Sequence, residues 1–209
     1  MNAKKRKLWQ ELVDAWNTVT PACHVYLAQE FATAYPKDFF GWIALADGLM
    51  NISAFESASK ALIRARRLAP KEHLSWCYLK SGKLYREKGD HRRAERWYRK
   101  AVSSSESQES SVFLGACLAK QGRFSEALLI HGKAASFDPE KADEALFNLG
   151  LIHRAEANFV VALSYFEQAI AIDPEYADAK TARDDIHKLL KIRSSVVRNK
   201  RPSRGVRRA

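Results

Sequence analysis

The densest group of side chains that could bind a charged ligand lies in the stretch GDHRRAERWYRKAV, from Gly89 to Val102. Guanidinium and ammonium groups pair with phosphates or carboxylates. Three of the arginines follow one another at intervals of four and then three residues, which places them on one face of a helix. The basic residues of the stretch are Arg92, Arg93, Arg96, Arg99 and Lys100. This pattern is compatible with contact to a polyanion, and also with the solvent face of a packing helix.

Residues suited to catalysis or metal binding do not fall into recognisable arrangements. The chain has six histidines and three cysteines, but none of the HxxxH or CxxC spacings that hold zinc. It also lacks the glycine-rich phosphate loop and the nucleophile elbow of hydrolases. The sequence therefore predicts a protein that is not an enzyme and that needs neither a metal ion nor a cofactor.

Positive charge is concentrated in the middle and at the C-terminal end of the chain. Residues 57–104 carry fourteen Lys or Arg against four Asp or Glu, whereas 8–56 and 105–187 are net acidic. From residue 188 onward there are nine basic residues and no acidic one. The tail residues predicted to contact a polyanion are Arg198, Lys200, Arg201, Arg204, Arg207 and Arg208. This distribution favours an acidic protein or a nucleic acid as partner.

The sequence gives no indication of a targeting segment or a membrane span. The basic N-terminal run is followed by LWQELVDAW, which contains two acids and is too polar for a signal peptide. No run approaches the ~18 apolar residues of a transmembrane helix. We therefore expect a soluble, cytoplasmic protein without a membrane partner, in which Cys23, Cys77 and Cys117 are buried thiols.

An internal repeat organises the chain. Ala58, Ala94, Ala127 and Ala162 are spaced 36, 33 and 35 residues apart, and each is followed seven residues later by a second alanine. Small residues at this spacing form one helix face that a neighbouring helix can approach closely. A second amphipathic segment precedes each of these helices. The turn between the two helices of a unit is predicted at Ser53, Gly89, Gly122 and Ala157.

This pattern resembles the tetratricopeptide repeat (TPR). The family signature is matched best by Leu149-Gly150, Ala162, Phe166, Ala169 and Pro174. The resemblance implies an all-α fold in which helix-turn-helix units stack into a right-handed superhelical α-solenoid. We expect a degenerate helix pair at 1–37, four TPR units within 38–174 (about 38–72, 75–107, 108–140 and 143–175), a capping helix at 176–193 and a flexible basic tail at 194–209.

The resemblance also implies where a partner would bind. The first helix of each TPR pair lines the concave side of the superhelix. Matching the repeat to the family places these residues in the groove: Phe40, Ile43, Asp47, Trp76, Lys80, Lys83, Arg86, Phe113, Lys120, Phe147, Asn148 and Arg154. Trp76 is expected to be an exposed anchor, because the sequence suggests no packing partner for it.

Three functions are compatible with these features. The leading hypothesis is an adaptor or scaffold that binds a segment of a partner protein, acidic in character, in its concave groove. The alternative is an RNA- or DNA-associated protein that uses the basic central repeat and the C-terminal tail. A secretion-type chaperone is a third hypothesis, because chaperones of type III translocators are small TPR proteins.

Overall fold

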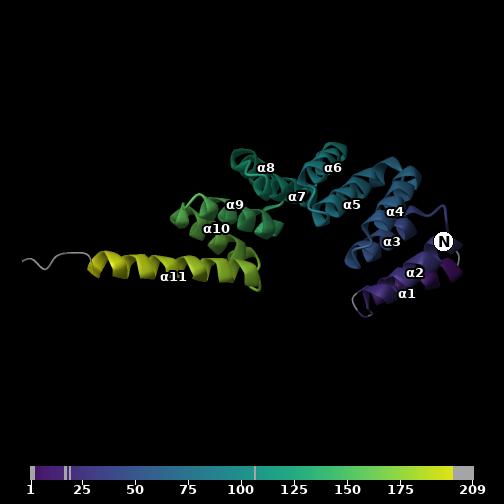
Figure 1. Ribbon diagram of the computed structural model, residues 1–209, viewed down its shortest axis with the longest axis horizontal. Helices are drawn as coiled ribbons and strands as arrows, with labels where there is room; N and C mark the ends of the chain where they lie inside the picture. The colour runs from purple at the N-terminus through teal and green to yellow at the C-terminus, as the bar shows by residue number, and fades with distance from the viewer. Residues whose placement is uncertain (1–2, 17, 19, 106, 200–209) are drawn as a thin grey trace, which may run out of the picture. The chain divides into compact units, whose positions relative to one another are not determined.

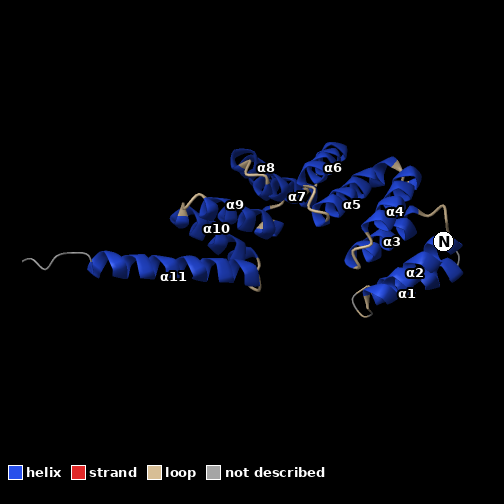
Figure 2. Cartoon of the chain, in the orientation of Figure 1, coloured by secondary structure: helices blue, strands red, loops and turns tan. Residues whose placement is uncertain are grey.

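The computed structural model is built from α-helices joined by short loops (Figure 1). It describes residues 3–16, 18, 20–105 and 107–199, and no β-strand occurs among them. Figure 2 shows the same chain with helices and loops distinguished by colour. The chain divides into two compact units, Met1–Ala127 and Leu128–Ala209. Each unit is a set of helices in which consecutive helices pack against one another.

The helices come in successive pairs, and α5 begins one residue before the interval predicted for its unit. Short 3-10 turns at Lys71–His73 and Pro139–Lys141 precede two of the pairs. The helices are α1 Ala3–Ala15, α2 Pro21–Ala34, α3 Phe39–Asn51, α4 Phe55–Leu68, α5 Leu74–Glu87, α6 His91–Ser104, α7 Gln108–Lys120, α8 Phe124–Phe137, α9 Asp143–Ala155, α10 Phe159–Ile172 and α11 Ala177–Asn199. The exact limits of the repeat units stay a prediction.

Side-chain caps begin several of these helices. The Asp38 carboxylate accepts a hydrogen bond from the Phe40 amide at the start of α3, at 2.9 Å. Asp90 accepts from the Arg93 amide at the start of α6, and Ser107 from the Ser110 amide at the start of α7. Such caps satisfy amide groups that have no partner within the helix. The serine-rich loop before α7 therefore ends at Ser107.

The turn inside four of the helix pairs requires a left-handed backbone conformation. The φ angles are +75° at Gly89, +74° at Gly122, 59° at Ser53 and 60° at Ala157. Glycine adopts this conformation without penalty, whereas a residue with a Cβ is strained there. The four turn positions predicted from the repeat are thus confirmed, and two of them carry a strained residue.

Close contact between the two helices of a pair depends on glycine facing an aromatic ring. A Cβ on Gly82 would lie 2.4 Å from ring atoms of Tyr98, and a Cβ on Gly150 would lie 2.4 Å from Phe166. The partner rings are fully buried. In α6, Ala94, Tyr98 and Ala101 form the buried stripe that the repeat predicts.

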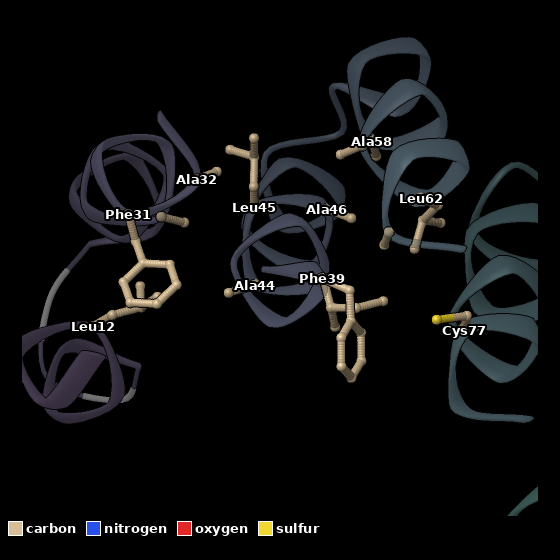
Figure 3. Close-up of a cluster of buried hydrophobic side chains, with 14 of the residues drawn as sticks. Leu12, Phe31, Ala32, Phe39, Ala44, Leu45, Ala46, Ala58, Leu62 and Cys77 are labelled. Carbon is tan, nitrogen blue, oxygen red and sulfur yellow. The ribbon is translucent and has the colours of Figure 1, made fainter. Parts of the chain in front are cut away.

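The core of the first unit runs continuously through α1 to α5. Figure 3 shows Leu12 of α1 beside the ring of Phe31 from α2, and Leu62 of α4 opposite Cys77 of α5. Alanines at the helix contacts let the backbones approach, while the larger apolar side chains fill the space between helices. In the second unit, Ala162 and Phe166 of α10 pack against Ala182 and Ile186 of α11.

Two sequence expectations are wrong. The C-terminal helix does not end at residue 193, because α11 continues to Asn199. Hydroxyl groups of Ser194 and Ser195 donate to carbonyl oxygens one turn earlier, at 2.8 and 2.7 Å, so these serines do not break the helix. Cys23 is exposed rather than buried, whereas Cys77 and Cys117 are buried as predicted.

Candidate functional site

An apolar cavity of about 250 Å³ opens on the first unit, between the first helices of three successive pairs. Helices α1, α3 and α5 each contribute to its lining, as the first helices of a TPR array are expected to do. Its lining residues are Trp9, Leu12, Val13, Trp16, Phe40, Ile43, Ala44, Asp47, Trp76 and Lys80. The cavity therefore brings together residues from three helix pairs.

Helix α1 presents one broad apolar face, part of which is buried in the core and part of which lines the cavity. Leu12 and Ala15 are buried. Trp9, Val13 and Trp16 follow one another at four- and three-residue intervals and line the cavity. Val13 is 47% exposed and Trp16 is 44% exposed. Exposed apolar groups at the mouth of a cavity are a common feature of binding sites.

Aromatic rings of α3 and α5 form the opposite wall of the cavity. The ring centroids of Phe40 and Trp76 are 5.6 Å apart, and those of Trp9 and Phe40 are 5.9 Å apart. Trp76 also lies edge-on to Phe39, with 6.3 Å between centroids. These contacts fix the wall before any partner binds. They also correct the expectation that Trp76 lacks a packing partner.

A second hollow, of about 460 Å³, adjoins the apolar cavity and is more polar. The two share Trp16, Asp47 and Lys80 in their linings, so they form one continuous site. We call this site the α1–α3–α5 groove. The lining of the second hollow is Trp16, Asp47, Met50, Asn51, Ser53, Phe55, Lys80, Lys83, Arg86 and Glu87.

A buried ion pair connects α3 and α5 where the two hollows meet. The Lys80 Nζ lies 2.6 Å from the Asp47 Oδ2, and the two side chains are 14% and 9% exposed. Burial raises the pKa of Asp47, and the charge and hydrogen bond of Lys80 oppose that increase. Burial also lowers the pKa of the nearby His24, whose ring is 4.6 Å from that of Trp16. Lys80 is therefore committed to a structural role.

The other two cations of α5 contact an aromatic ring and exposed carboxylates. The Lys83 Nζ lies 4.3 Å from the centroid of Phe113 on α7, and the Arg86 guanidinium lies 5.0 Å from it. Lys83 also binds the Glu109 carboxylate at 2.9 Å, and Arg86 binds that of Glu87 at 2.8 Å. The carboxylates of these pairs have side chains that are 55% and 49% exposed. Pairs of this kind are weak and exchange readily with another partner.

The predicted groove residues are thus only partly brought together. Seven of them line the α1–α3–α5 groove, and Phe113 lies beside it. One of the seven, Ile43, is only 1% exposed. Lys120 is exposed but does not line either hollow.

The predicted residues of α9 belong to the second unit. Phe147 packs against Phe166 and Tyr176, with ring centroids 5.7 and 5.0 Å away. The Asn148 amide donates to the Glu144 carbonyl oxygen at 2.9 Å, and Arg154 is exposed. Their place in a groove stays a prediction.

Sequence reasoning missed the contribution of α1. Trp9, Val13 and Trp16 were not among the predicted groove residues because α1 matches the repeat only poorly. A signal was nevertheless present in the segment LWQELVDAW. Its apolar residues cover one arc of the helix that is broader than the stripe buried against a single neighbouring helix, so part of the arc is left for a binding site.

The predicted polyanion residues of α6 fall into two groups. Arg93 pairs with Asp90 at 3.3 Å, and Arg99 pairs with Glu95 at 2.8 Å. Arg123 also binds Glu95, at 2.8 Å. Although burial raises the pKa of Glu95, hydrogen bonds from Gln121, Arg99 and Arg123 outweigh that effect and lower it. Arg99, one of the three arginines predicted to lie on one face of the helix, is thus part of a local ion-pair network.

The remaining basic residues of α6 are exposed. Arg92, Arg96 and Lys100 point to solvent and make no ion pair with a described carboxylate. The side chain of Arg198 is not described, and the predicted tail contacts Lys200, Arg201, Arg204, Arg207 and Arg208 lie outside the described residues.

Comparison with known proteins agrees with this helical-repeat architecture. Models of the tetratricopeptide repeat match residues 79–142 and 143–176. A TPR repeat-containing protein of Methanocaldococcus jannaschii, MJ1428, is 27% identical over 135 residues, which are 65% of this chain and 24% of that protein. The chain therefore spans about a quarter of the length of this relative.

Solved structures show the same fold at low sequence identity. The type IV pilus biogenesis factor PilW is 16% identical, with a TM-score of 0.77 over 91% of this chain and 88% of that one. YrrB, a TPR protein with an unusual peptide-binding site, is 19% identical, with a TM-score of 0.60 over 78% of this chain and 84% of that one. The fold and the repeats define a helical-repeat scaffold. The chain is a tetratricopeptide repeat protein.

Proposed function

We propose that this TPR protein is a non-enzymatic scaffold that binds a segment of a partner protein in the α1–α3–α5 groove. In this proposal an apolar side chain of the partner enters the cavity between Trp16, Phe40 and Trp76, and an acidic residue of the partner reaches Lys83 and Arg86. The observation that carries the proposal is the continuity of an aromatic cavity with a polar hollow that contains two accessible cations.

The apolar part of the groove supplies the affinity. Protein interfaces concentrate their binding energy in a few aromatic or apolar anchors that enter well-formed pockets. Here the pocket wall is already assembled by ring contacts among Trp9, Phe40 and Trp76. A wall that does not rearrange reduces the entropy lost on binding. Trp16 and Val13 add exposed apolar surface at the mouth of the cavity.

The charged part of the groove supplies selectivity rather than strong attraction. Each of its three lysine and arginine residues is already paired with a carboxylate of this chain, so the groove has little net charge. A partner carboxylate can replace Glu109 or Glu87, because both are exposed. It cannot replace Asp47, which is buried with Lys80. In this proposal Lys83 and Arg86 therefore bind the acidic residue of the partner.

Selection from a random peptide library against the full chain tests this proposal. Enriched peptides should carry a large apolar residue a few positions from an Asp or Glu. Their affinity, measured by fluorescence anisotropy, should fall at least about tenfold for Val13→Glu, because a carboxylate at the cavity mouth would face an apolar anchor. The matched control is Val160→Glu, at a position of the second unit that is 79% exposed.

The charged contacts need a separate variant. In Lys83→Gln with Arg86→Gln, the affinity of peptides that contain an acid should fall by about three- to tenfold, and peptides with that acid replaced by Ala should be unaffected. Lys80 is not a suitable position, because its loss leaves Asp47 buried without a partner. Peptides that bind Val13→Glu and Val160→Glu equally well would show that the groove is not the binding site.

Other aspects of the function stay as predictions. No described helix has both the length and the apolar character needed to cross a membrane. A cytoplasmic location and a secretion-type chaperone role stay predictions from the sequence.

A further inference from the structure

A strongly basic surface covers the solvent side of α4 and α6, the second helices of two successive pairs in the first unit. Its four residues on α4 were not among the polyanion contacts predicted from sequence. The residues of this α4–α6 basic surface are Lys60, Arg64, Arg66 and Arg67 of α4 and Arg92, Arg96 and Lys100 of α6. All but Arg66 are exposed.

Trp97 joins the two halves of the surface. The Arg66 guanidinium of α4 and the Lys100 ammonium of α6 each lie 4.6 Å from the centroid of its ring. Arg64 lies in the same way over the ring of Trp42, at 4.7 Å. An aromatic face holds a cation in place without neutralising its charge. These contacts therefore order three cations and leave them able to bind an anion.

The carboxylates of α4 and α6 form their ion pairs with cations that lie outside the surface. Glu56 of α4 binds Lys88 at 2.7 Å. On α6, Glu95 binds Arg99 and Arg123, and Asp90 at its start binds Arg93. The surface thus differs from the α1–α3–α5 groove, in which every described lysine or arginine has a carboxylate partner. None of its cations forms an ion pair with a described carboxylate, although the charge of Lys60 helps to lower the pKa of the nearby Glu56.

A hollow of about 460 Å³ lies between the cations of α4, lined by Lys60, Ile63, Arg64, Arg67 and Leu68. Three basic side chains around one hollow can surround a phosphate group, and guanidinium groups can bind its oxygens in pairs. On α6, Arg92, Arg96 and Lys100 form a row about 12 Å long at 1.5 Å per residue. That length corresponds to about three phosphates of one strand.

We propose that the α4–α6 basic surface binds nucleic acid through its phosphate backbone, without reading the base sequence. The surface has rows of cations that form no ion pair with a described carboxylate, and such rows suit a chain of phosphates. It lacks the apolar anchor of a protein interface, since Ile63, 39% exposed, is the only large apolar side chain of α4 or α6 with substantial exposure. Bases cannot readily stack on Trp97, because its ring already contacts Arg66, Lys100 and Tyr78.

Binding of the full chain to a labelled single-stranded RNA of mixed sequence tests this proposal, with fluorescence anisotropy measured over a series of salt concentrations. Three variants each remove four positive charges. The surface variant carries Lys60→Gln, Arg67→Gln, Arg92→Gln and Arg96→Gln. The control variant carries Lys4→Gln, Arg6→Gln, Lys120→Gln and Lys133→Gln, which are exposed and lie elsewhere. The tail variant carries Arg201→Gln, Arg204→Gln, Arg207→Gln and Arg208→Gln. Far-ultraviolet circular dichroism checks that each variant folds.

The surface variant should bind at least about tenfold more weakly than the parent near physiological salt, and its log–log salt slope should be smaller by about 3, because about 0.7 counterions are released per phosphate contact. The control variant should stay within about twofold of the parent. Equal losses in the surface and control variants would show that binding follows net charge alone and would overturn the proposal. So would loss of binding in the tail variant with none in the surface variant, or no binding by the parent at low salt.

Two competitors separate nucleic acid from other anions. Polyglutamate, matched to the RNA in concentration of charges, should displace the RNA poorly. Displacement as effective as that by unlabelled RNA would identify a surface for acidic proteins and overturn the proposal. Vesicles of phosphatidylserine and phosphatidylcholine should bind the parent and the surface variant with equal affinity. A loss of vesicle binding in the surface variant, without a loss of RNA binding, would assign the surface to membranes instead.

Discussion

The α5–α6 pair of the first unit and the α9–α10 pair of the second pack their two helices in the same way, but their exposed side chains differ. In both, a glycine of the first helix faces a buried ring of the second: Gly82 faces Tyr98, and Gly150 faces Phe166. On the outside, however, α6 carries exposed arginines, whereas α10 carries Val160 and Val161, which are 79% and 43% exposed. The interior of the repeat specifies the fold, and the exterior is free to carry function.

The first helices of the two pairs differ in the same way. Lys80 of α5 forms a buried ion pair with Asp47 of the preceding pair. Asn148, which occupies the matching position of α9, bonds instead to the Glu144 carbonyl oxygen within its own helix. The same repeat position thus has a structural role in one pair and is replaceable in the other. Substitutions at matched positions of the two pairs test this difference.

The largest change in the free energy of unfolding is expected on substitution of Lys80. In Lys80→Met, Asp47 stays buried without its partner, so the free energy of unfolding should fall by about 3 kcal/mol. The matched change Asn148→Met removes one exposed hydrogen bond and should cost no more than about 0.5 kcal/mol. Urea unfolding followed by circular dichroism measures both. Equal losses would mean that the Asp47–Lys80 pair contributes no more than a surface contact.

The pH dependence of the Lys80→Met variant provides an independent check. Burial already raises the pKa of Asp47 in the folded parent, and removing Lys80 raises it further. A raised folded-state pKa means that stability is greatest where Asp47 is protonated and falls as pH rises above the unfolded-state value of about 3.9. The difference in unfolding free energy between parent and variant should therefore be small in acid and grow toward neutral pH. A constant difference would exclude Asp47 as its cause.

A smaller effect, and the same one in both pairs, is expected at the inter-helix glycines. Gly82→Ala and Gly150→Ala each place a Cβ 2.4 Å from ring atoms, and should each cost about 2 kcal/mol because the buried ring has to move. Gly132→Ala in α8 is the control, since nothing lies within 4 Å of its added Cβ. That change should stabilise the helix by about 0.5–1 kcal/mol. Tolerance of Ala at position 82 but not at 150 would break the equivalence of the two pairs.

The features that could be predicted from the sequence are those that the repeat encodes locally. Alanine and ring spacing predicted the buried stripe of Ala94, Tyr98 and Ala101, and the turn at Gly89. Such features depend on residues a few positions apart in one helix pair. They therefore survive in every unit in which the pattern can be recognised.

The features that could not be predicted depend on side chains that meet across repeats. The partners of Lys80 and Lys83 are 33 and 26 residues away, and the repeat signature does not specify either of them. Trp76 was expected to be exposed because its contacts with Phe39 and Phe40 come from the preceding pair. The repeat predicts which face of a helix looks outward, but not whether a charge on that face is already paired.

The smallest change in the free energy of unfolding is expected from substitutions in the turn inside each pair, where one pair has Gly89 and the other has Ala157. Gly89 and Ala157 both have a left-handed backbone, with φ of +75° and 60°. Ala157→Gly should therefore raise the free energy of unfolding by about 1 kcal/mol, because it removes the strain of a Cβ in this conformation. Gly89→Ala should lower it by a similar amount.

A neighbouring residue separates turn strain from a general effect of glycine. Ala155→Gly, at the C-terminal end of α9, changes the same side chain two residues earlier, where the backbone is helical. This change should destabilise the chain, because glycine loses more backbone entropy than alanine on joining a helix. Opposite signs at positions 155 and 157 in thermal unfolding would attribute the gain to the left-handed turn. Destabilisation at both positions would show that glycine relieves no strain in the turn at Ala157.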